Sequence, residues 1–333
     1  MSWKPIIACH VLILATFICC TAAAQTGGSF SVTGSLSVGR DSHTATATAT
    51  LLKNGLVVTI GGYNGAYLSD ADLYYPAKGR FYQFGHLNIP RAYHTATLLT
   101  NGLVLVVGDY GSSGYLSSAE LYNPATGQFT MTGTLNIARE YHTATLLSNG
   151  KVLVVGGYDG TYVASAELYD PSTGTFSVTG NLVTAREYHS ATLLSTGNVL
   201  IAGGYNGGYL SSAELYNPSS GAFSSTGSLV AARQYHAAVA LRNGNVLIIA
   251  GYNANYLSSA ELYSPSNGTF TSTGSLATAR TNHTASLLEN GFVLVAGGYA
   301  STGYLASAEI YDSVAGTFKV TGNLKDTLNK CCS

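Results

Sequence analysis

The stretch REYHSATLLSTGNVLIAGGYNGGYLSSAELYNPSSGAFSSTGSLVAA, residues 186–232, decides the fold of this chain. It begins with Arg-x-x-His and continues through two short apolar runs that a Gly-Asn turn separates, the second ending in Gly-Gly-Tyr. A polar loop leads to Ala-Glu-Leu-Tyr, and a Pro-containing turn then leads to Gly-x-Phe. Short apolar runs bounded by Gly, Asn and Pro are typical of strands joined by tight turns, so the stretch predicts four short strands.

The same unit recurs along the whole chain. Its Arg-x-x-His histidines, spaced by 47 to 51 residues, are His43, His94, His142, His189, His236 and His283. Four strands in a repeat of this length is the period of a β-propeller blade, which buries its faces only against neighbouring blades. The sequence therefore predicts an all-β, six-bladed propeller with four antiparallel strands per blade, forming one domain over residues 25–323.

Within this repeat, the chain resembles the Kelch family. The resemblance rests on the double glycine that ends the second strand, as at Gly203-Gly204, and on a Tyr followed seven positions later by a second aromatic residue, as at Tyr216 and Phe223. The chain departs from the pattern in several places. The second aromatic residue is Phe instead of the usual Trp, Asp109 and Ala250 each replace one glycine of a pair, and Ser313 replaces the Pro of the other copies. The resemblance implies a Kelch-type propeller that binds partners.

The sequence leaves the closure of the ring open. The aromatic-led fourth strand occurs seven times, because Gly28-Ser29-Phe30 also matches it. Either the Phe30 segment or the Phe318 segment could complete the last blade.

The two ends of the chain differ from the repeats. Lys4, an apolar run of about 15 residues and small residues before position 25 predict a signal peptide over residues 1–24, with an N-terminal anchor as the alternative, and hence a secreted protein (periplasmic or cell-surface if bacterial). Residues 324–333 form a short tail with Cys331 and Cys332, which could link two chains through a disulfide or simply fray. Asn267 and Asn282 lie in glycosylation sequons, which matter only in a eukaryote.

Composition narrows the classes of partner. Charged residues make up 9% of the chain, and 15 Lys and Arg face 16 Asp and Glu, so the basic excess of a nucleic-acid binder is absent. No apolar run after residue 30 is long enough to span a membrane. The expected partners are proteins, peptides or glycans.

The charged residues that recur once per repeat are candidates for a structural role. The Arg of Arg-x-x-His and the acid of Ala-Glu-Leu-Tyr occur once per repeat, and buried charges of this kind should pair and tie blades together. The six histidines would be too widely spaced to hold one metal ion, so we expect neutral imidazoles, no metal site and no cofactor.

Topology predicts where a ligand would bind. In a four-stranded antiparallel blade, the loop between the second and third strands and the connection from the previous blade emerge on one face. That face would carry Tyr, Asn, Gly and Ser, the composition of recognition surfaces. The resemblance also implies interblade arginines in the pocket. The candidate binding residues are Arg91, Arg139, Arg186, Arg233, Arg280, Tyr158, Tyr162, Tyr205, Tyr209, Asp109, Glu140 and Glu187.

The leading functional hypothesis is a non-catalytic module that recognises a protein, a peptide or a carbohydrate. A structural component of an extracellular coat or matrix is the alternative. An enzyme, such as a galactose-oxidase-like or glycan-acting one, is disfavoured because the folded body has no Cys and few carboxylates outside the repeated position.

Overall fold

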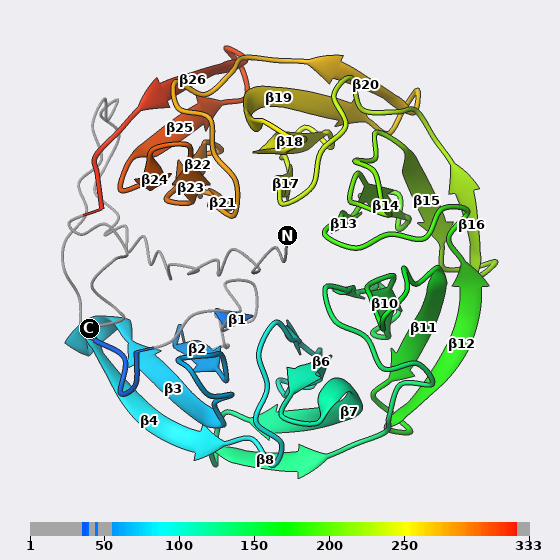
Figure 1. Cartoon of the computed structure of the whole chain (residues 1–333), viewed down its shortest axis with the longest axis vertical. Coiled ribbons are helices and arrows are strands. Elements are labelled where there is room, and N and C mark those ends of the chain that lie inside the picture. Colours follow the sequence, from blue (N-terminus) through cyan, green and yellow to red (C-terminus); the bar gives the residue numbers. More distant parts are fainter. Residues whose placement is uncertain (1–34, 40–43, 46–54, 325–333) are drawn as a thin grey trace, which may run out of the picture.

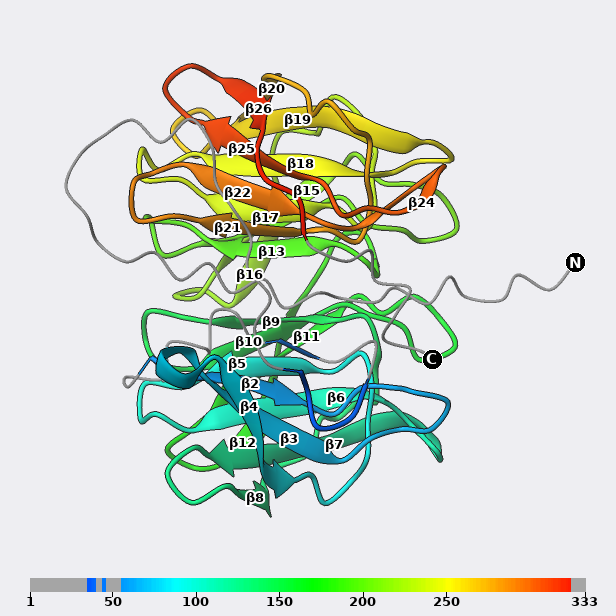
Figure 2. The same ribbon diagram turned by 90° about the vertical axis from the view of Figure 1, so that its left-hand side faces the viewer.

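The computed structural model describes residues 35–39, 44–45 and 55–324. The expected signal peptide, the Phe30 segment and the Cys331–Cys332 pair lie outside the described residues. Figure 1 shows sheets arranged radially around a central axis, each with its first strand innermost. Figure 2 shows the same ring from its edge. No helix in the described ranges is long and apolar enough to cross a membrane.

Every blade contains a four-stranded antiparallel sheet in chain order, which confirms the six-bladed propeller. The first three blades consist of β1 (Thr44–Ala45), β2 (Val57–Ile60), β3 (Asp70–Tyr75) and β4 (Arg80–His86); β5 (Thr95–Leu98), β6 (Val104–Gly111), β7 (Gly114–Asn123) and β8 (Gln128–Met131); and β9 (Thr143–Leu146), β10 (Val152–Val155), β11 (Ser165–Asp170) and β12 (Thr175–Asn181).

The last three blades repeat this order, with one short extra hairpin. They consist of β13 (Ser190–Leu193), β14 (Val199–Ala202), β15 (Ala213–Asn217) and β16 (Ala222–Ser225); β17 (Ala237–Ala240), β18 (Val246–Tyr252), β19 (Tyr256–Ser264) and β20 (Thr269–Ser272); and β21 (Thr284–Leu287), β22 (Val293–Ala296), β25 (Ala308–Asp312) and β26 (Thr317–Val320), with β23 (Tyr299–Ala300) and β24 (Gly303–Tyr304) as the hairpin.

The second strand of each blade is buried on both sides, which explains its unbroken apolar run. In β10, Val152 and Val154 pack with Leu105 and Val107 of β6 in one core cluster. The alternate residues Leu153 and Val155 pack with Val199 and Ile201 of β14 in the next. The core is therefore a series of interfaces between neighbouring sheets, as expected of a ring whose blades cannot fold alone.

The structure decides which segment completes the last blade. β26 pairs with β25, with Phe318 opposite Tyr311, and the two rings lie 4.7 Å apart. The Tyr311 hydroxyl lies 2.8 Å from Thr273 Oγ1 of the preceding blade. Of the two alternatives that the sequence left open, the Phe318 segment occupies the fourth-strand position.

The double glycines are required by a close approach between strands. Gly204 has a φ of 104°, and a Cβ there would lie 2.5 Å from the carbonyl oxygen of Glu187. Asp109 occupies the matching position of the second blade with a φ of 78°. There the Tyr110 N–H to Ala92 O hydrogen bond is 3.3 Å long, whereas the matching bond from Tyr205 to Glu187 is 2.9 Å. The reciprocal bonds, from Ala92 to Tyr110 and from Glu187 to Tyr205, are both 3.0 Å long, so only one hydrogen bond of the pair lengthens beside Asp109.

Candidate functional site

The face predicted from topology exists as expected. In the second to sixth blades, the residue two positions before the repeat histidine pairs with the end of the second strand of the same blade, as Glu187 does with Tyr205. The second-to-third loop continues from the same point, where Tyr205 pairs with Tyr209. Blade connections and these loops therefore share one face, which we call the loop face.

A continuous row of tyrosines follows the loop face through all six blades. Each blade contributes two half-buried rings, whose centroids lie 5.1 to 5.4 Å apart. Each pair reaches the next blade at 5.9 to 6.1 Å. We call this row the tyrosine ladder, and its members are Tyr63, Tyr67, Tyr110, Tyr115, Tyr158, Tyr162, Tyr205, Tyr209, Tyr252, Tyr256, Tyr299 and Tyr304.

A second group of tyrosines lies immediately before the innermost strands. Tyr93, Tyr141, Tyr188 and Tyr235 follow one another from blade to blade, with centroids 5.4, 4.4 and 4.2 Å apart. Each adopts a left-handed backbone with φ between 53° and 63°. We call this group the inner stack. The sequence showed a Tyr before His in these copies, but nothing in the pattern indicated that the rings would contact one another.

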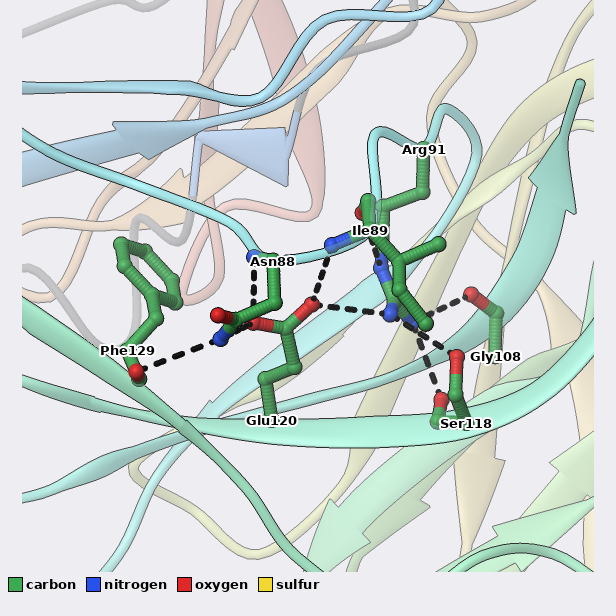
Figure 3. Close-up of polar contacts among 7 residues, drawn as sticks. All are labelled: Asn88, Ile89, Arg91, Gly108, Ser118, Glu120 and Phe129. Atoms are coloured by element: carbon green, nitrogen blue, oxygen red, sulfur yellow. Dashed lines mark hydrogen bonds and ion pairs between the residues drawn. The ribbon is translucent and has the colours of Figure 1, made fainter.

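The side chains of the five candidate arginines do not reach the surface of the loop face. All five side chains are fully buried. Figure 3 shows Arg91 donating to the carbonyls of Ile89, Gly108 and Ser118, to Ser118 Oγ and to Glu120 Oε1. Glu120 in turn accepts hydrogen bonds from the backbone of Asn88 and Ile89 in the incoming blade connection. The placement favours the blade-tying role that the sequence left open.

The same clamp recurs in the next four blades. Nitrogen–oxygen distances in the five Arg–Glu pairs range from 2.6 to 3.1 Å. Burial lowers the pKa of each arginine, and the partner glutamate opposes this. In the first blade Asp72 takes the place of the glutamate and accepts a hydrogen bond from Ser37 Oγ. The clamps fix each blade connection against the third strand of its own blade.

The histidines are buried and linked between blades. Nε2 of His142, His189 and His236 lies 2.9 Å from a Thr or Ser hydroxyl that begins the innermost strand of the preceding blade. Burial lowers the pKa of His142 and His236 to about 3, so both imidazoles are neutral. In the part of the chain that the structure describes, no group of three or more His, Cys, Asp or Glu side chains could hold a metal ion.

Asp109 lies beneath the loop face, and its side chain is not exposed on it. Its Oδ1 accepts the Tyr141 N–H at 2.9 Å and lies 3.6 Å from His142 Nδ1. Burial, and then the charge of Glu140, raise the pKa of Asp109 well above its usual range. Burial lowers the pKa of the His142 imidazole, so it is Asp109 and not the imidazole that burial makes easier to protonate.

Glu140 and Glu187 lie at the surface of this region, but only a small part of each residue is exposed, 9% of Glu140 and 7% of Glu187. Burial raises the pKa of Glu140 to about 7, and the Tyr141 side chain lowers it through a hydrogen bond. Burial and the charge of Glu140 raise the pKa of Glu187 to about 8. The structure thus brings these two candidates together with the candidate tyrosines, and places Asp109 and the arginines below them.

The two sequon asparagines occupy different surroundings. Asn267 is exposed in the turn between β19 and β20, and its side chain accepts hydrogen bonds from Thr269. Asn282 is half-buried with a φ of 52° at the position that the inner stack tyrosines occupy in earlier blades.

Radial four-stranded sheets, glycine pairs against the incoming strand and a buried Arg–Glu clamp in each of five blades define the class of protein as a repeat β-propeller. Residues 94–298 match the KLHDC2/KLHL20/DRC7 Kelch-repeats domain, so the chain belongs to this Kelch-repeat family. No curated protein matches the chain.

Proposed function

We propose that this propeller is a binding module that recognises a protein or peptide on its loop face. Kelch propellers typically bind proteins. The observation that carries the proposal is the tyrosine ladder, because half-buried Tyr rings give a ligand apolar contact area and a hydroxyl at low cost in conformational entropy. Loop residues beside it, such as Asn206 and Gly207, add small polar contacts.

The module acts by binding and not by catalysis. This proposal is supported by the repeated Arg and Glu residues, which are engaged in clamps, and by the buried histidines, which hydrogen-bond between blades. We further propose that the protein is secreted, on the strength of the leader-like residues 1–24. A carbohydrate ligand is the second candidate, since the same aromatic rows suit sugar faces.

A peptide and glycan array probed with the purified chain tests this proposal. We expect saturable peptide binding that the double variant Tyr205→Ala/Tyr209→Ala weakens at least tenfold. Tyr82→Ala is the matched control, because this 42% exposed tyrosine lies on β4, outside the ladder. An array on which nothing binds, or binding that the ladder variant leaves intact, contradicts the proposal.

A further inference from the structure

Acidic side chains gather on the third and fourth blades of the loop face. Glu140 and Glu187 precede the inner stack in the third and fourth blades, and Asp159 lies in the loop after Tyr158. The same position holds Gln234 in the fifth blade and Thr281 in the sixth, while Asp41 of the first blade lies outside the described residues. We define Glu140, Asp159 and Glu187 as the acidic sector.

No positive charge within the described residues compensates the two glutamates. The only group that lowers the pKa of Glu140 is the Tyr141 side chain, and none lowers that of Glu187. The nearby Arg139 and Arg186 are held by Glu167 and Glu214. Within the described ranges, the Glu187 carboxylate accepts no hydrogen bond although the residue is more than nine-tenths buried. The Glu187 oxygens are not among the fully buried polar atoms, so a ligand can reach this carboxylate.

A second observation lies in the neighbouring blade. Gln234 occupies the position equivalent to Glu187 and is 8% exposed. Its Oε1 is buried and has no hydrogen-bond partner among the described residues. Tyr235, directly after it, has a pKa that the charges of both glutamates raise. The Gln234 amide oxygen, which has no donor among the described residues, thus lies next to the acidic sector. A ligand that donates hydrogen bonds would suit both.

Aromatic rings surround the two carboxylates. Glu140 and Glu187 directly precede Tyr141 and Tyr188 of the inner stack, whose ring centroids lie 4.4 Å apart. On the other side, Glu140 pairs with the ladder residue Tyr158 and Glu187 with Tyr205. The carboxylates therefore lie between the ladder and the inner stack.

We propose that the acidic sector binds the ammonium group of a lysine side chain that a protein partner inserts between the tyrosine ladder and the inner stack. The inference rests on the proposed function and names its ligand chemistry. An ammonium group supplies three hydrogen-bond donors and one positive charge to the carboxylates and to the Gln234 amide oxygen. The alkyl stem of lysine packs on tyrosine rings, and its charge is attracted to their faces. A metal ion would find no set of three ligands among the described residues.

Calorimetric titration of the full chain at pH 8.5 tests the inference with defined probes. These are the acetylated and amidated tripeptide Gly-Lys-Gly, its Nε-acetyl counterpart and butylammonium. The test variant is Glu140→Gln/Glu187→Gln, whose side chains the fold accepts because Gln234 occupies the same position. Glu289→Gln is the matched control, since it removes a charge from an exposed residue in the turn between β21 and β22.

We expect the lysine tripeptide to bind the wild type and Glu289→Gln equally, and the double variant at least tenfold more weakly. The Nε-acetyl tripeptide should not bind, and butylammonium should bind more weakly than the lysine tripeptide with the same dependence on the glutamates. Equal binding of the two tripeptides, or no effect of the double variant, overturns the inference. Butylammonium binding as tightly as the lysine tripeptide overturns it too, because a free amine would then suffice.

The array distinguishes this failure from failure of the proposed function. If bound peptides depend on Tyr205 and Tyr209 but are indifferent to lysine and to the glutamates, the ladder binds and the ammonium inference is wrong. If no peptide binds at all, both are wrong.

Discussion

At the scale of single residues, one missing hydroxyl interrupts the links between innermost strands. Thr95, Thr143 and Ser190 each face the histidine of the following blade. Ala237 stands at the next position of this series, and both ring nitrogens of His283 are buried without a partner in the described residues. Because an unsatisfied buried polar group costs free energy, His283 marks a local weakness.

Ala237→Thr should therefore raise the free energy of unfolding by about 1 kcal/mol, since it supplies a hydroxyl to His283. Urea denaturation followed by fluorescence measures the change. Ser190→Ala is the converse control and should cost about 1 kcal/mol by orphaning His236 Nε2. A threonine that destabilises the protein would show that the site cannot admit the hydroxyl.

The two surface glutamates should make stability depend on pH. Their pKa values are raised, to about 7 for Glu140 and about 8 for Glu187, above the usual 4.5. The folded state therefore binds more protons than the unfolded state in this window, and stability falls as pH rises from about 5 to 8. Glu140→Gln/Glu187→Gln should remove part of this slope and raise the Tm at pH 8.5 more than at pH 5. If the double variant changes the Tm by the same amount at pH 5 and at pH 8.5, the two glutamates are not the source of the pH dependence.

At the scale of elements, the Arg–Glu clamp stabilises the structure in the five blades where the structure describes it. The Arg186 guanidinium donates hydrogen bonds to the carbonyl oxygens of Gly203 and Ser212 and to the Glu214 carboxylate. Glu214 also accepts hydrogen bonds from the backbone N–H groups of Val183 and Thr184. Removing one partner of such a pair leaves a buried charge alone.

Arg186→Ala should lower the free energy of unfolding by about 3–5 kcal/mol because it strands Glu214. Chemical denaturation of the single variant and of Arg186→Met/Glu214→Leu measures this. The double variant should cost clearly less than Arg186→Ala, since no charge remains buried. A normally stable Arg186→Ala protein would mean that the arginine serves binding instead.

The strands were predictable and the roles of the arginines were not. Gly-Asn turns, double glycines and the Tyr–Phe pairs repeat in phase, and each has a local physical reason that sequence alone reveals. Whether Arg186 faces a ligand or Glu214 depends on how a blade connection crosses its own sheet, which no spacing encodes. The contacts within the inner stack depend in the same way on the distance between innermost strands.

At the scale of the whole molecule, the last blade uses the same aromatic pair as the others. Phe318→Ala should cost about 2–3 kcal/mol, because its ring packs on Tyr311 and on the fifth-to-sixth blade core. Phe223→Ala in the fourth blade is the matched comparison and should cost a similar amount. Denaturation midpoints compare the two, and a Phe318→Ala protein as stable as the wild type would show that β26 does not complete the ring.

The low charge of the chain, 9% of residues, leaves the loop face nearly uniform from blade to blade. An elongated ligand lying along the tyrosine ladder would meet six nearly equivalent placements. Such degeneracy favours binding by only about 1 kcal/mol of statistical free energy and fixes no orientation. The acidic sector lies on the third and fourth blades, so a partner that binds it as proposed would adopt a preferred rotational register on the ring.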